Sequence, residues 1–146
     1  MRGAMTHVAL ICDDSELQAE LPQLFIISTK SISAKAYKDI DHTVPRNIFI
    51  VRQASGWGNS DLMSNLIRPL GKALAPRRSK FAAIIFMDTA RCHGHPRVLR
   101  ACSDTGIVPI FIPAKTTWLL QPLDTHGFVL YTAAVQRAYN DAHIDN

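Results

Sequence analysis

Apolar residues in this chain gather in short runs at residues 7–12, 24–27, 48–51, 81–87 and 108–112. Runs of aliphatic, β-branched and aromatic residues that end at turn signals are typical of strands. The first two runs enclose a polar segment and predict a hairpin whose loop spans roughly residues 13–22. The run at 81–87 is apolar on both faces, which predicts a central strand covered by helices on each side.

One stretch after the third run has the period of a helix. Gly56-Trp57-Gly58 breaks the chain, Asn59 or Ser60 can cap a helix, and Pro69 is expected to kink that helix or begin a fresh turn. Trp57 is predicted to be a packed aromatic residue rather than a ligand-stacking one. One apolar stripe defines the helix, and it consists of Leu62, Leu66, Leu70 and Leu74 with Met63 and Ile67 beside them.

Two more helices are predicted nearer the C-terminus. One starts at Pro96 and stops at Gly106, and its inward residues are expected to be Val98, Leu99 and Cys102. The other starts near Gln121-Pro122 and keeps one apolar face through Phe128, Tyr131, Val135 and Tyr139. Residues 29–47 show no clear period and predict an irregular connection. The order of elements predicts a single α/β domain over residues 1–146 with a mixed sheet.

Composition and charge narrow the class of protein. Hydrophobic residues make up 47% of the chain and charged residues 19%, as in an ordinary folded protein, and no apolar run approaches the ~20 residues of a membrane span. Three scattered cysteines favour free thiols in a reducing compartment. The net charge of +4 is compatible with nucleic acid. The basic residues are most concentrated in one stretch, which contains Arg68, Lys72, Arg77, Arg78 and Lys80. This stretch is either a phosphate-contacting patch or a solvated helix end.

Two acids follow the last two apolar runs. Asp88 comes directly after the run at 81–87, and Asp124 lies beyond the run at 108–112. One strand-helix-strand unit can bring both to the same sheet edge, where two carboxylates could bind Mg²⁺. The alternative is structural, because an acid after a strand often caps the next helix, as Asp124 could do.

The residues around these acids resemble a known family. Asp88-Thr89-Ala90 is followed by His93, and the last apolar run leads into Pro113-Ala114-Lys115-Thr116-Thr117 and then Leu120-Gln121-Pro122-Leu123-Asp124. This pattern resembles the DDE superfamily endonuclease domain of pogo/Tigger-like, mariner-type transposases. The resemblance extends to Gly56-Trp57, the leucine-striped helix and the opening strands, and covers roughly residues 6–139.

The resemblance implies an RNase H-like fold, a mixed sheet flanked by helices, and metal-dependent cutting and joining of DNA in the nucleus. It implies Mg²⁺ or Mn²⁺ held by three acids, with Asp88 as the second and Asp124 as the third. Gln121 then sets the helix of the third acid, and Thr116 and Thr117 flank the site. His93 matches the family histidine or is a simple loop histidine. A zinc site at Cys92-His93-Gly94-His95 is disfavoured, because this short segment has no matching ligand pair elsewhere.

The chain departs from the family at its first acid. That acid lies on a strand before the segment matching residues 7–12, and residues 1–6 contain no Asp or Glu. We therefore expect an N-terminally truncated domain that lacks the first strand, with weak metal binding and impaired cleavage. Asp13 and Asp14 are expected to be turn residues at the opposite end of the hairpin, away from Asp88 and Asp124.

Three further expectations follow from this departure. A missing strand leaves backbone groups that invite a second copy or a strand-supplying partner chain. Thr132 stands where such domains often carry a basic residue, and the helix-turn-helix region of full-length relatives is not found here. The alternative function is a non-catalytic nucleic-acid- or protein-interaction module derived from a transposase.

Overall fold

Two separate β-sheets contain the strands: four lie at the predicted runs 24–27, 48–51, 81–87 and 108–112, whereas the first is at residues 5–8 and not at 7–12 as predicted. The computed structural model describes residues 5–80, 82–116 and 128–144. In the first sheet the outer strands flank β2, which is antiparallel to β1 and parallel to β3. In the second sheet β4 and β5 are parallel. The strands are β1 (Met5–Val8), β2 (Gln23–Ser28), β3 (Ile48–Gln53), β4 (Ala83–Asp88) and β5 (Ile107–Ile112).

The helices connect these strands and confirm the mixed α/β class. They are α1 (Ser15–Glu20), α2 (Ala34–Asp41), α3 (Ser60–Leu74), α4 (Pro96–Asp104) and α6 (Phe128–Ile144), with a 3₁₀ turn η1 (Ala75–Arg77) after α3. Among the residues that the structure describes, no helix combines the length and apolar character needed to cross a membrane. The predicted start of the last helix, near Gln121-Pro122, lies outside the described residues.

Two of these helices were missed by the sequence prediction. The predicted hairpin loop contains α1, and the predicted irregular connection contains α2. Both are short, so neither has a long apolar period, but both have a side-chain cap. Asp14 Oδ1 accepts hydrogen bonds from the backbone N–H groups of Glu16 and Leu17, and Ser33 Oγ accepts one from that of Ala36.

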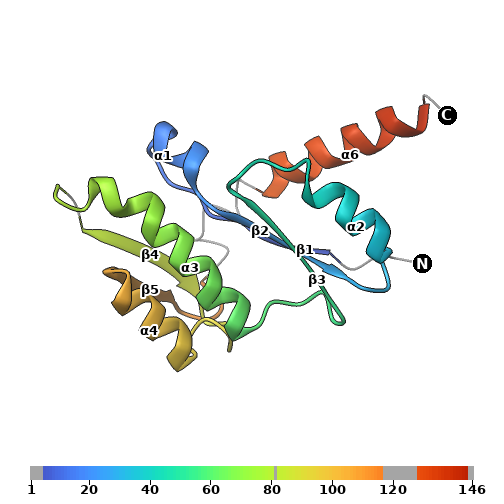
Figure 1. Cartoon of the computed structure of the whole chain (residues 1–146). Coiled ribbons are helices and arrows are strands. Elements are labelled where there is room, and N and C mark those ends of the chain that lie inside the picture. Colours follow the sequence, from blue (N-terminus) through green and yellow to red (C-terminus); the bar gives the residue numbers. More distant parts are fainter. Residues whose placement is uncertain (1–4, 81, 117–127, 145–146) are drawn as a thin grey trace.

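Helix α3 holds the two sheets together (Figure 1). Its side chain Ile67 is 1% exposed and belongs to one core that includes Ile26 of β2, Val98 of α4 and Ile107 of β5. Asn59 caps the helix, as predicted, and α3 continues through Pro69. The leucine stripe is confirmed, because Leu66 and Leu70 are buried and the outer leucines are partly buried against the core.

Three burial predictions are wrong within the described residues. Trp57 is 72% exposed, and it follows Gly56, which adopts a left-handed φ of 67° in the preceding turn. Leu99 is 38% exposed at the edge of the α4 apolar face. The second sheet is covered mainly on one face: Met87 and Ile107 are buried there, whereas the other face is exposed at Ile84, Phe86, Val108 and Ile110 and is buried only at its end, at Ile112.

Candidate active site

Asp88 is the last residue of β4 and lies at the edge where β5 also ends. The two strands are parallel and in register, with Asp88 opposite Ile112. Their carboxyl ends therefore share one edge of the sheet, as the strand-helix-strand argument predicted. The segment that leads toward the second predicted acid begins at this same edge.

The Asp88 carboxylate is oriented by two donors on one oxygen. Its Oδ1 accepts a hydrogen bond from the backbone N–H of Ala90 at 3.0 Å and lies 2.6 Å from Nδ1 of His93. Within the described residues, Oδ2 has no hydrogen-bond or ion-pair partner, and the side chain is 40% exposed. One oxygen thus fixes the carboxylate and the other remains open to an incoming ligand.

His93 is a positioning residue for this carboxylate. Its side chain is 18% exposed, and Nδ1 also lies 3.3 Å from the backbone carbonyl oxygen of Asp88. Both neighbours are acceptors, so Nδ1 carries the hydrogen. Two contacts to one residue fix the orientation of the ring relative to Asp88.

The neighbouring His95 and Cys92 have structural roles. His95 caps α4, because its Nδ1 accepts the backbone N–H of Arg97 at 3.2 Å, and Cys92 packs against the core. No group of three or more His, Cys, Asp or Glu side chains able to hold a metal occurs among the described residues.

A tight turn follows β5 beside the site. The backbone N–H and the hydroxyl of Thr116 both donate to the carbonyl oxygen of Pro113, at 3.2 and 2.7 Å. Lys115 has a φ of 71°, a conformation that is uncommon for a residue with a Cβ. The remaining predicted site residues, which are Thr117, Gln121 and Asp124, lie outside the described residues, so the convergence of Asp124 on Asp88 stays a prediction.

Comparison with protein families identifies the domain. Residues 5–145 match the family model described as the DDE superfamily endonuclease. The chain belongs to this family. A search of curated proteins and a search of solved structures each gave no significant match. The sequence resemblance is thereby confirmed over nearly the whole chain, and the DDE endonuclease family is one of transposase-derived nucleases that use divalent metals and act on DNA.

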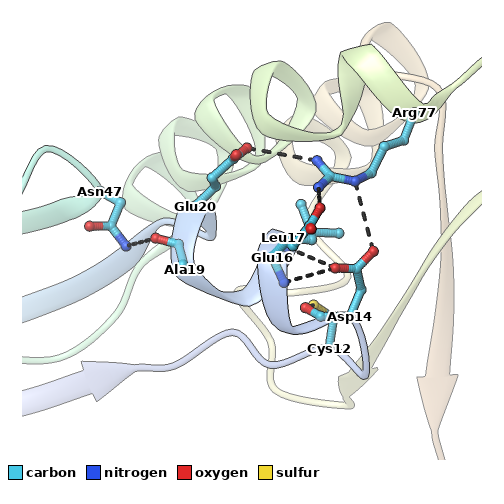
Figure 2. Close-up of polar contacts among 8 residues, drawn as sticks. All are labelled: Cys12, Asp14, Glu16, Leu17, Ala19, Glu20, Asn47 and Arg77. Carbon is cyan, nitrogen blue, oxygen red and sulfur yellow. Dashed lines mark hydrogen bonds and ion pairs between the residues drawn. The ribbon is translucent and has the colours of Figure 1, made fainter.

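Asp14, the acid that follows the first apolar run of this DDE endonuclease domain, is the N-cap of α1 and has a structural role. Both its oxygens are engaged: Oδ1 caps α1, and Oδ2 lies 3.9 Å from Nε of Arg77 (Figure 2). The hydrogen bond from the Leu17 backbone N–H, followed by the charge of Arg77, lowers the pKa of Asp14. Asp14 lines a cavity that residues 82–85 at the start of β4 also line, whereas Asp88 at the other end of β4 does not line it.

Two members of the predicted basic stretch are engaged within the domain. Arg77 lies within 3.9 Å of the carboxylates of Asp14, Glu16 and Glu20 (Figure 2). Arg78 donates to the carbonyl oxygen of Gly71. These interactions tie η1 to α1 and to α3, and they reduce the positive charge that Arg77 presents to solvent.

A second basic cluster lies between α3 and α4; it combines Arg68 of the predicted stretch with two arginines that the sequence analysis missed. Arg68 of α3 and both Arg97 and Arg100 of α4 line a cavity of about 360 Å³, together with Asp61 and Asp104. Arg97 pairs with Asp61. The signal was available in the sequence, because residues three apart on a helix share one face.

Asp88 fits the divalent ion that the DDE endonuclease family implies. Its open carboxylate oxygen is a hard donor at an exposed sheet edge, the type that Mg²⁺ and Mn²⁺ prefer. The described residues contribute this donor and the histidine that orients it. Further ligands have to come from elsewhere in the chain or from the substrate.

Proposed function

We propose that this domain acts on nuclear DNA as a DDE-type endonuclease, through a Mg²⁺ or Mn²⁺ ion held by Asp88 and Asp124. The open Oδ2 of Asp88 carries this proposal, because it is a pre-oriented carboxylate oxygen at the carboxyl end of a parallel strand. Asp124 joins it by its place in the family motif. The proposal commits to phosphodiester chemistry at the β4–β5 edge.

The residues of such a site have separate roles in holding the ion and in orienting the carboxylate. A bound divalent ion supplies Lewis-acid stabilisation of a phosphodiester and activation of water. Asp88 holds the ion on Oδ2, and Ala90 and His93 prevent the carboxylate from rotating away. Two carboxylates bind a hard ion more weakly than three, since affinity follows ligand count and charge. A site formed by Asp88 and Asp124 alone is therefore expected to bind the ion weakly and to cleave slowly.

Metal binding and plasmid nicking test this proposal together. Mn²⁺ binding is measured by electron paramagnetic resonance on the wild type and on Asp88→Asn, Asp124→Asn and Asp39→Asn, the last an exposed acid of α2 as a matched control. We expect weak binding that both site variants lose and the control keeps. Nicking of supercoiled DNA is expected to be slow and confined to proteins that bind Mn²⁺. Mn²⁺ binding that survives both site substitutions would refute the proposal.

A second function, DNA binding without cleavage, is favoured by the arginine cluster. Arg68, Arg97 and Arg100 present three guanidinium groups on neighbouring helices, and guanidinium groups bind phosphates in a bidentate manner. Substitution of Arg68 and Arg100 by Gln is expected to weaken DNA binding and to lower the salt slope by about 1 for each phosphate that the variant no longer binds. An unchanged slope in both variants would exclude this surface.

A further inference from the structure

Trp57 is the most exposed large hydrophobic residue in the described part of the chain, at 72%. Tryptophan is largely buried in most folded proteins, because its indole ring provides a large apolar surface. Both chain neighbours of Trp57 are glycines, so neither covers the ring with a side chain. The indole therefore offers most of its surface to a ligand.

The turn that carries Trp57 is fixed by its own hydrogen bonds. The side-chain amide of Gln53 donates to the carbonyl oxygen of Trp57, and the backbone N–H of Trp57 donates to Oγ of Ser55 at 3.3 Å. Nδ2 of Asn59, the cap of α3, donates to Oε1 of Gln53 at 3.3 Å. The turn is thus tied to the end of β3 and to the start of α3. A ring on a fixed turn loses less conformational freedom on binding than a ring on a free loop.

This turn lies on the same side of the core as Asp88. Helices α3 and α4 run side by side in the same direction (Figure 1). Arg97 in the first turn of α4 pairs with Asp61 in the first turn of α3, and Thr105 just after α4 packs against Gly71 near the end of α3. The turn leads into the start of α3, and the end of β4 precedes the start of α4. Both therefore lie at the edge where the two helices begin.

The segment after β2 adds a positive charge beside this turn. The backbone N–H of Thr29 donates to the carbonyl oxygen of Gln53 at 2.8 Å, so the two segments are neighbours. Lys30 is exposed, and neither residues 28–33 nor residues 53–60 contain an acidic side chain. Aromatic rings beside basic residues are the combination with which proteins bind single-stranded nucleic acid.

We propose that Trp57 stacks on an unpaired base of a DNA strand that lies along the Asp88 edge, with Lys30 beside an adjoining phosphate. The stack rests on the DNA function proposed above and deepens it, because it restricts the ligand to DNA with an unpaired base. Stacking tolerates any sequence, since every base has a π face. The cavity between α3 and α4 has no aromatic residue in its lining, so it can supply phosphate contacts but no aromatic stack.

Binding of a fluorescein-labelled thymidine oligonucleotide, followed by fluorescence anisotropy in EDTA, tests this stack. Without metal, the measurement is independent of ion binding at Asp88. Trp57→Ala is expected to weaken binding about tenfold, whereas Trp57→Phe keeps an aromatic ring and is expected to retain most of the affinity. Trp57→Leu keeps an apolar side chain without a ring and is expected to bind as weakly as Trp57→Ala. The control Phe86→Ala removes a ring that is 62% exposed on β4 and is expected to leave binding unchanged.

An oligonucleotide in which abasic residues replace the thymidines separates stacking from charge. The wild type is expected to bind this abasic strand about tenfold more weakly than the thymidine strand, and Trp57→Ala is expected to bind both strands with similar affinity. Lys30→Gln is expected to weaken the binding of both strands alike, because a phosphate contact does not depend on the base.

Equal affinity of the wild type and Trp57→Ala for the thymidine strand would overturn the proposal, as would an absence of binding by the wild type. Self-association of the wild type without DNA that Trp57→Ala abolishes, measured by sedimentation, would also overturn it and assign Trp57 to an interface between copies. Mn²⁺ binding reports on the nuclease function separately. Trp57→Ala is expected to keep Mn²⁺ binding, and Asp88→Asn is expected to lose it while binding the thymidine strand in EDTA as the wild type does.

Discussion

Each sheet of this domain has an aspartate and a histidine close to one of its strands: Asp14 and His7 in the first sheet, and Asp88 and His93 in the second. The two pairs have different roles. In the first sheet His7 and Asp14 belong to different contacts: His7 stacks on Phe25 with ring centroids 4.1 Å apart, and Asp14 engages both oxygens within the fold. In the second sheet His93 and Asp88 contact each other. Their contact leaves one Asp88 oxygen open.

Asp14 and Asp88 differ in the contacts of Oδ2, whereas the contacts of Oδ1 are similar. Oδ1 of each aspartate accepts two donors, in both cases including a backbone N–H two residues along the chain. Oδ2 of Asp14 faces Arg77, whereas Oδ2 of Asp88 has no partner among the described residues. A fully engaged carboxylate stabilises the fold, and a half-engaged one can bind a substrate or an ion. The same local turn therefore serves two purposes.

The largest expected effect is that substitution of one aspartate removes Mn²⁺ binding, whereas substitution of the other lowers stability. Asp88→Asn is expected to abolish Mn²⁺ binding and any nicking while changing the free energy of unfolding by no more than about 0.5 kcal/mol, because the side chain is 40% exposed. Asp14→Asn is expected to lower the melting temperature and to leave Mn²⁺ binding intact. Binding and calorimetry on both variants measure this. Loss of Mn²⁺ binding in Asp14→Asn would contradict the assignment of a structural role to Asp14 and a metal-binding role to Asp88.

The shared core gives the next largest effect. Ile67 of α3 is 1% exposed and contacts the core of both sheets, so Ile67→Ala is expected to lower the free energy of unfolding by about 2–5 kcal/mol. Urea unfolding by circular dichroism gives the magnitude. Hydrogen exchange is expected to show equal loss of protection in β2 and β5.

The control for this prediction is Ile84→Ala, a substitution at 53% exposure with an expected change within about 0.5 kcal/mol. If Ile67→Ala lowered protection in one sheet only, the two sheets would be separate folding units, and the comparison between them would be one between independent modules.

Much of this arrangement could be predicted from the sequence because it rests on strong local patterns. The strands at 48–51 and 108–112, the Asn59 cap and the parallel β4–β5 edge were all predicted. Short helices such as α1 and α2 were not, since their signal is a single capping side chain rather than a period.

The sequence predicted Asp88 as a site residue, but it did not predict how the Asp88 carboxylate is oriented. Asp88 was identified from its place after a strand and from the family motif. That one oxygen is fixed by Ala90 and His93 depends on side-chain torsions, which spacing does not specify. The role of Arg77 was also hidden, because its partners lie some sixty residues earlier in the chain and belong to a helix that was not predicted.

A smaller effect is the pH dependence that His7 imposes on the first sheet. Burial lowers the pKa of His7 below its ordinary value of 6.5, so His7 stabilises the fold in its neutral form. That contribution is complete above pH 6.5 and is lost as the pH falls through the folded-state pKa. His7→Phe keeps the stack on Phe25 and removes the buried, unpartnered Nδ1. The variant is expected to become more stable than the wild type as the pH falls from 7 to about 5.

Melting curves of both proteins across this range measure the difference, and the other histidines cancel because they are the same in each protein. A pH-independent difference in melting temperature would mean that His7 titrates alike in the folded and unfolded chains. The contrast with His93, which has an acid partner, would then rest on geometry alone.

The smallest expected effect is the pH dependence of stability due to Asp14. It distinguishes the contribution of the helix cap from that of the ion pair with Arg77. Its pKa is lowered from 3.8, first by the hydrogen bond from the Leu17 backbone N–H and then by Arg77, so its contribution to stability is present above about pH 4 and is lost as the pH falls through the folded-state pKa. The melting temperature of the wild type is expected to exceed that of Asp14→Asn at pH 7, and the gap is expected to close as the pH falls through the lowered folded-state pKa of Asp14. Asp13→Asn is the control, since Asp13 has no side-chain hydrogen bond or ion pair with a described residue.

Arg77→Met decides which interaction dominates. If the backbone hydrogen bond is the larger cause, the gap between an aspartate and an asparagine at position 14 persists when measured in the Arg77→Met background, because the charged cap still gains from two N–H donors. If the gap vanishes in that background, the ion pair is the reason that Asp14 is fully engaged. The availability of Asp88 would then follow from the absence of a cation beside its Oδ2 in the described residues rather than from the shape of its turn.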